Sequence, residues 1–148
     1  YAHGNEPSHH VIHLYNYVNR PWRTQELVDS VYKSQYANSV DGLSGNEDCG
    51  QMSAWYILNS MGFYQVCPGK PVYSIGRPAF DKAVINLPGE KTFSIVVKNN
   101  AKTHKYIESV LLNGKPLDTP FFNHQDITAG GVMEIKMTDR PTKWGVSK

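Results

Sequence analysis

The sequence predicts an α+β protein with a helical first half and a β-sandwich second half. Over residues 1–68, apolar side chains recur with the spacing of amphipathic helices. Over residues 71–148, short alternating segments are separated by turn dipeptides such as Pro-Gly and Asn-Gly, the pattern of successive strands. We therefore divide the chain into a helical part, 1–69, and a strand part, 70–148.

Three helices are expected in the first part. The first covers 7–18, with Asn5 or Glu6 at its N-cap and a proline in its first turn. The second, 22–36, is amphipathic, and the third, 50–61, has no charged residue, so we expect it to be buried on several sides. Two neighbours cannot cover such a helix. The three are therefore expected to be the last helices of a larger, layered helical domain.

The strand part contains five segments with strand character. Short strands at this spacing favour an antiparallel sandwich. The expected strands are 72–75, 82–87, 92–97, 106–112 and 132–137.

Composition narrows the function classes. Of 148 residues, 15 are basic and 13 are acidic, and no basic block indicates binding to nucleic acid or an anionic membrane. No apolar run approaches the roughly 18 residues of a membrane helix. The chain begins at Tyr1 without an initiator Met, so we expect a processed chain or part of a longer one. Cys49 and Cys67 are expected to be two separate buried thiols, with a disulfide as the alternative.

Two polar clusters immediately precede predicted helices. Asn5 and Glu6 open the first helix, and Asn46, Glu47 and Asp48 precede the third. Helices joined by short connections run antiparallel, so the first and third should be parallel with their N-termini at one end. Capping explains such residues singly. Two glycine-flanked clusters at one helical end favour a hard-cation site, for which calcium is suited, together with a general base.

The histidines and aromatic residues have alternative interpretations. His9, His10 and His13 share helical faces, but no Cys or spaced carboxylate completes a tetrahedral zinc set. We favour a role for His9 and His10 in shaping a polar pocket. Three aromatic residues are core by default and candidates for a sugar subsite: Trp22, Trp55 and Tyr56.

Several of these segments resemble one family. Residues 4–10 read GNEPSHH, residues 15–25 contain YNY and PWRTQ, and residues 41–56 read DGLSGNEDCGQMSAWY. They are similar to GNEPSHH, YNY…PWKTQ and DGLxGNEDxGQMSAWY of glycoside hydrolase family 92, the calcium-dependent exo-acting α-mannosidases. The likeness continues over residues 62–76 into the strands.

The resemblance implies a fold and a mechanism. The helices would belong to an (α/α)6 barrel packed on a β-sandwich, in an enzyme that hydrolyses terminal α-mannosides with inversion, α-1,2-linked mannose being the expected substrate. Asp48 would be the general base, with Glu47 in the same acidic triplet. Asn46 stands where some members have Asp, and its amide could only orient water or sugar.

The resemblance also implies partners. Calcium would be held by Asn5, Glu6 and His9 or His10, and we assign substrate contacts to Trp22 and Gln51. The general acid would lie upstream, so the expected partners are α-mannoside glycans and the remainder of the parent chain, in an exported protein. The alternative is a carbohydrate-binding or structural β-sandwich module without catalysis.

Overall fold

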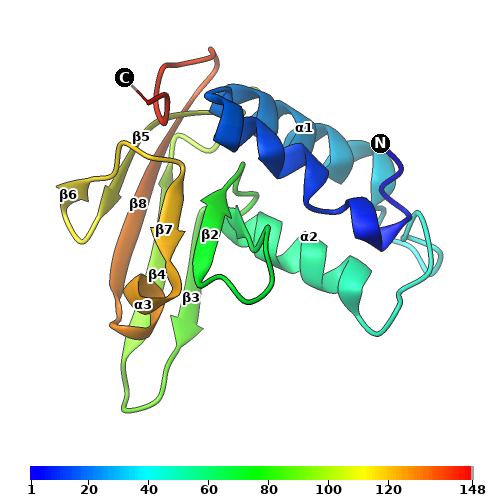
Figure 1. Cartoon of the computed structure of the whole chain (residues 1–148), viewed down its shortest axis with the longest axis horizontal. Coiled ribbons are helices and arrows are strands. Elements are labelled where there is room, and N and C mark those ends of the chain that lie inside the picture. The colour runs from blue at the N-terminus through cyan, green and yellow to red at the C-terminus, as the bar shows by residue number, and fades with distance from the viewer. Residues whose placement is uncertain (148) are drawn as a thin grey trace.

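The α+β class predicted from the sequence is confirmed. A computed structural model describes residues 1–147, in which a layer of helices is docked against a β-sandwich (Figure 1). The helical layer contains η1 (Glu6–Ser8), η2 (Val11–Val18), α1 (Pro21–Gln35) and α2 (Gln51–Met61). The remaining elements are β1 (Phe63–Tyr64), β2 (Val72–Ile75), β3 (Lys82–Asn86), β4 (Thr92–Lys98), β5 (Tyr106–Leu112), β6 (Lys115–Pro116), β7 (Phe121–Asn123), α3 (His124–Thr128) and β8 (Gly131–Thr138).

The first helix differs from the expected α-helix over 7–18. It consists of the two 3-10 segments η1 and η2. A 3-10 helix has three residues per turn, so side chains at i and i+3 lie in one row. That spacing puts His13 and Asn16 in register, and both reach the Ser74 hydroxyl of β2, at 3.1 Å and 2.7 Å. The buried polar pair thus accounts for the tighter winding.

The other two helices begin and end within a residue of the predicted positions. Gly62, with a φ of 104°, ends α2 in the left-handed conformation that favours glycine. Met52 and Trp55 on α2 are fully buried, but Ile57 on the same helix is 54% exposed. The expectation of burial on several sides is therefore wrong for residues 1–147, because the η2–α1 layer and the sandwich cover only part of the helix surface.

Two sheets form the sandwich. One has the strand order β1-β2-β7 and the other β3-β4-β8-β5-β6. All pairs are antiparallel except β4 and β8, which are parallel, so the expectation of a purely antiparallel sandwich is wrong at this pair. β8 lies between β4 and β5, and its alternating side-chain pattern carries no information about strand direction. The short strands β1, β6 and β7 were not predicted.

Two hydrophobic clusters hold the layers. The sandwich cluster packs side chains of both sheets face to face, among them Ile75, Phe122, Phe93 and Ile135. The helical cluster is smaller and contains Ile12, Val28, Val31, Trp55 and Tyr64.

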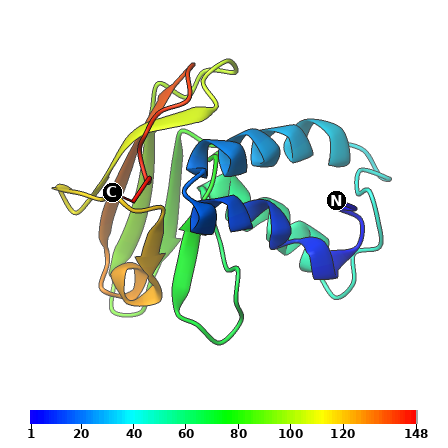
Figure 2. The same cartoon turned by 45° about the horizontal axis from the view of Figure 1, so that its top comes forward.

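Buried polar groups join the helices to the sandwich. Asn16 donates to the Ile75 carbonyl (2.9 Å), and the Gln25 amide oxygen accepts from the Ile107 N–H of β5 (3.0 Å). Both α1 and η2 therefore contact the sandwich at the ends that meet residues 19–21 (Figure 2).

Neither cysteine is buried. Cys49 and Cys67 lie in loops, and both are exposed and unbonded. The prediction of separate thiols is confirmed, but the prediction of burial is wrong, because each residue lies outside the packed faces of the neighbouring elements. Within residues 1–147, no helix has the length and apolar character needed to cross a membrane.

Candidate active site

The two polar clusters lie at the same end of the helical layer, as expected. The backbone of Gly4 packs against the backbone of Ser44 and Gly45, and a Cβ at Gly4 would be 2.6 Å from the Ser44 carbonyl oxygen. The Trp55 indole N–H donates to the His9 carbonyl at 3.1 Å, so α2 runs alongside the first segment. The turn that carries Asn5 and Glu6 therefore neighbours the loop that carries Asn46–Asp48.

The loop before α2 has a strained backbone. Asp48, Cys49 and Gly50 have successive positive φ angles of 42°, 57° and 87°. Left-handed conformations cost a non-glycine residue roughly 1 kcal/mol or more, and they persist where the surroundings impose them. The Asp48 carbonyl accepts the Gln51 N–H at 3.2 Å, while its carboxylate is exposed and makes no hydrogen bond or ion pair within residues 1–147. This carboxylate is free to act on a ligand.

Glu47 has a structural contact instead. Its carboxylate accepts the Ser53 N–H at 3.0 Å and the Ser53 hydroxyl at 2.8 Å, which caps the first turn of α2. Capping is therefore the observed role of Glu47. Asn46 is exposed and its side chain has no protein partner in the described chain.

Asn5 and Glu6 present oxygen atoms beside this loop. Asn5 is the N-cap residue of η1, but its side chain makes no capping hydrogen bond. Glu6 is half-buried, and its Oε1 atom is buried without a hydrogen-bond partner. Because η1 is only three residues long, the predicted helix dipole adds little here. Across residues 1–147, no group of three or more His, Cys, Asp or Glu side chains is arranged to hold a metal.

His9 and Gln51 are engaged with each other. His9 donates from Nε2 to the His3 carbonyl at 2.9 Å, so its Nδ1 accepts from the Gln51 amide at 3.1 Å. The same amide donates to the Tyr64 hydroxyl at 3.0 Å. Burial lowers the pKa of His9, which keeps it neutral at pH 7. Of the two predicted histidine ligands, only the half-buried His10 has no internal hydrogen bond within the described residues.

His3 was not among the predicted site residues, yet it is at the centre of this region. Only 3% exposed, it makes hydrogen bonds to Tyr1 (2.8 Å) and Tyr36 (2.7 Å). Burial lowers its pKa to about 4. Its place directly before the Gly4-Asn5-Glu6 motif was the only sequence signal that could have identified it.

Trp22 lies elsewhere. It is half-buried in the first turn of α1, next to the residues that contact β5. A 15-residue helix is roughly 22 Å long, and α1 runs opposite to α2. The structure therefore brings Asn5, Glu6, His9, His10, Gln51 and the 46–48 loop together, but it does not bring Trp22 to them.

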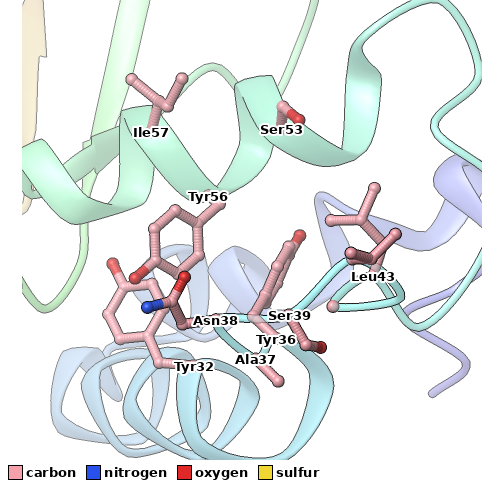
Figure 3. A pocket seen from close by; sticks show the side chains of 11 residues that line it. Tyr32, Tyr36, Ala37, Asn38, Ser39, Leu43, Ser53, Tyr56 and Ile57 are labelled. Atoms are coloured by element: carbon pink, nitrogen blue, oxygen red, sulfur yellow. The ribbon is translucent and has the colours of Figure 1, made fainter.

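Two pockets flank the helices. The larger, of about 530 Å³, lies between α1, α2 and the 37–43 loop; Tyr56 points toward Tyr32 and Tyr36 across it, and Ser53 lies at its edge (Figure 3). The smaller, of about 490 Å³, is bordered by His3 and Asn5. None of the predicted site residues lines the larger pocket, so the chemistry points to the cluster at the end of the helical layer.

Comparisons with known proteins agree with one another. Residues 1–139 match the family model described as "Glycosyl hydrolase family 92 catalytic domain". A protein named "Uncharacterized secreted glycosidase" from Arthroderma benhamiae is 29% identical over 98% of this chain. A GH92 alpha-mannosidase from Bacteroides thetaiotaomicron, solved in complex with mannoimidazole, is 38% identical over 98% of the chain, with a TM-score of 0.94.

A GH92 inverting mannosidase from the same bacterium is 40% identical over 99% of the chain, with a TM-score of 0.93. In each case the chain spans only about a fifth of the relative, between 19% and 20% of its length.

Proposed function

The chain belongs to glycosyl hydrolase family 92, and on this premise we propose that it carries the general base of an inverting exo-α-mannosidase. The free Asp48 carboxylate, presented on a strained turn next to Asn5 and Glu6, is the observation that supports this role. In an inverting glycosidase, one carboxylate takes a proton from the attacking water while a carboxylic acid protonates the leaving oxygen. Asp48 is the proposed acceptor of that proton.

The neighbouring residues have separate proposed roles. Glu47 holds the first turn of α2 through Ser53 and so fixes the position of Asp48. Asn46, with an exposed amide, orients water or a sugar hydroxyl. Gln51 acts on the substrate only through its free amide oxygen, since its N–H group is used by His9 and Tyr64. The general acid belongs to a part of the parent protein outside this chain.

We propose calcium as the cofactor. Hard cations prefer carboxylate and amide oxygens, and the unpartnered Glu6 Oε1 and the uncapped Asn5 side chain fit that preference. His9 does not fit, because both of its ring nitrogens are engaged. When bound, calcium supplies positive charge beside the sugar hydroxyls. The coordination sphere is completed by groups outside this set, such as His10, sugar hydroxyls, water or upstream residues.

The helical layer is proposed to be part of an (α/α)6 barrel in the longer protein. Its uncovered apolar side chains support this, since three of them lie in one row on η2: Val11, Leu14 and Tyr17. Ile57 adds a fourth on α2. We propose that upstream helices cover these side chains. Export is proposed as well, because the Arthroderma relative is named a secreted protein.

A carbohydrate-binding module is not favoured by the sandwich. Among the large apolar side chains of residues 70–147, only Phe80 and Val84 are exposed, and they form no aromatic row for a sugar to stack on.

The experiment is an assay of the full-length enzyme on α-1,2-mannobiose, with NMR detection of the product anomer and with or without a calcium chelator. We expect β-mannose as the first product, loss of activity on chelation, and loss of activity in Asp48→Ala. Full activity after exhaustive calcium removal, or in the Asp48 variant, would exclude the proposed mechanism.

A further inference from the structure

His3 is held by more contacts than the proposed mechanism requires of it. Its ring stacks on His9 with a centroid distance of 4.6 Å and meets the edge of Trp55 at 4.3 Å. Both ring nitrogens also make hydrogen bonds to tyrosine hydroxyls. A buried, fully paired histidine next to the Asn5–Glu6 turn is suited to position other groups.

The direction of the hydrogen bonds follows from their last acceptor. The Tyr36 hydroxyl donates to the Met52 carbonyl at 3.0 Å, because a carbonyl only accepts. The Tyr36 oxygen therefore accepts from His3 Nε2, and His3 Nδ1 accepts from the Tyr1 hydroxyl. One oriented chain thus runs from Tyr1 through His3 and Tyr36 to the backbone of α2.

The end of this chain lies in the turn that holds the proposed base. Met52 is the second residue of α2, and its N–H donates to the Glu47 carbonyl at 3.3 Å. The flanking N–H groups, of Gln51 and Ser53, donate to Asp48 O and to the Glu47 carboxylate. Three consecutive amides of this turn therefore hold residues 47 and 48. A contact that fixes Met52 fixes the Asp48 loop as well.

We propose that His3 and Tyr36 are positioning residues of the active site. Through the Met52 carbonyl they fix the first turn of α2, and with it the Asp48 carboxylate, relative to the Asn5–Glu6 turn. The inference rests on the proposed function only for its catalytic consequence. The mechanical part, a link between the N-terminal turn and α2, concerns the fold alone.

Tyr36 also packs, and the two roles are separable. Its ring lies parallel to that of Trp55, with an interplanar angle of 4° and a centroid distance of 5.9 Å. Tyr36→Phe keeps this packing and removes only the hydroxyl. Tyr32, one turn earlier on α1, offers a matched control. It packs edge-on against Trp55 and donates one hydrogen bond to a backbone carbonyl, that of Arg77 (3.1 Å), outside the 46–53 region.

The test compares Tyr36→Phe and Tyr32→Phe in the full-length enzyme. Small misplacement of a catalytic group costs up to about 100-fold in rate. We expect kcat on α-1,2-mannobiose to fall roughly 10- to 100-fold in Tyr36→Phe, with KM within about twofold, and to stay within about twofold in Tyr32→Phe. A similar kcat in the two variants, or a change in KM alone, overturns the positioning role.

Hydrogen–deuterium exchange gives a readout that does not depend on activity. Amides in the peptide covering residues 47–56 should exchange faster in Tyr36→Phe than in the wild type and in Tyr32→Phe. Unchanged exchange overturns the link itself. If the wild-type enzyme fails to cleave mannosides while exchange responds as expected, the proposed function is wrong and the link stands.

Variants of His3 provide an independent check. His3→Gln keeps an N–H donor for Tyr36, whereas His3→Met fills similar space without one. We expect His3→Gln to retain most of the wild-type kcat and His3→Met to match Tyr36→Phe. The double variant of His3→Met with Tyr36→Phe should be no slower than either single variant, because both remove one chain. Additive losses would contradict the proposal.

Discussion

Glu47 and Asp48 are adjacent carboxylates for which the structure indicates different roles, and conservative substitution separates them. Glu47→Gln keeps an oxygen that accepts one hydrogen bond from Ser53, but it removes the negative charge at the start of α2. Losing a cap costs about 1 kcal/mol, and losing a favourable charge at a helix N-terminus costs about 0.3–1 kcal/mol. We therefore expect Glu47→Gln to destabilise the chain by roughly 1 kcal/mol.

The rate should respond differently at the two positions. Loss of a general base lowers kcat by about 10²- to 10⁴-fold, which is the expectation for Asp48→Asn. Glu47→Gln should lower kcat by less than about tenfold, because Asp48 keeps its carboxylate and only its support weakens. Steady-state kinetics of the full-length enzyme and urea unfolding of the 148-residue chain measure the two quantities. If Glu47→Gln loses as much activity as Asp48→Asn at unchanged stability, Glu47 is catalytic and the capping argument is wrong.

Three further predictions concern the surroundings of the site. Burial lowers the pKa of His13 to about 4, against 6.5 when unfolded. The unfolded state then binds more protons in between, so stability is complete above pH 6.5 and falls by about 3 kcal/mol as the pH drops to 4; urea unfolding at both pH values should show this loss in the wild type and a smaller one in His13→Gln. A Cβ at Gly45 would overlap the Gly4 carbonyl, so Gly45→Ala should separate the two clusters and lower kcat/KM at least about tenfold, and an unchanged kcat/KM would show that their contact is dispensable. Cys49 and Cys67 are exposed and unbonded, so a thiol reagent should label both in the native chain, and mass spectrometry showing one or no adduct would contradict the structure.

Periodicity predicted the regular elements because their burial is regular. Strand β5 was predicted residue for residue, and its two central neighbours within two residues, since each alternates between buried and exposed positions. The 3-10 winding of η2 was missed, because it depends on a hydroxyl of β2 that lies 58 residues beyond Asn16 in the sequence. Strand direction was missed for a similar reason: alternation is the same in parallel and antiparallel pairs.

The site divides along the same line. Helix direction was enough to predict that Asn5–Glu6 and the 46–48 loop meet, because it follows from short connections. Whether a given carboxylate is free or capped was not predictable, since both Glu47 and Asp48 precede α2 and only the left-handed turn after Asp48 separates their roles. Trp22 was assigned to the substrate by its type, and its place at the other end of α1 follows from helix length and direction.

The position of β8 has a consequence for how the protein is made. It is the last strand of the sandwich in the sequence but an interior strand of the five-stranded sheet, where it joins β4 to β5. During synthesis, the β3–β4 hairpin emerges early and has no neighbour on its β4 side until residue 138 has left the ribosome. At about 5–20 residues per second, the 40 residues between β4 and the end of β8 leave that edge unpaired for roughly 2–8 seconds. Nascent chains of this protein should therefore depend on chaperones until translation passes β8, whereas the helices beside β2 can pack earlier.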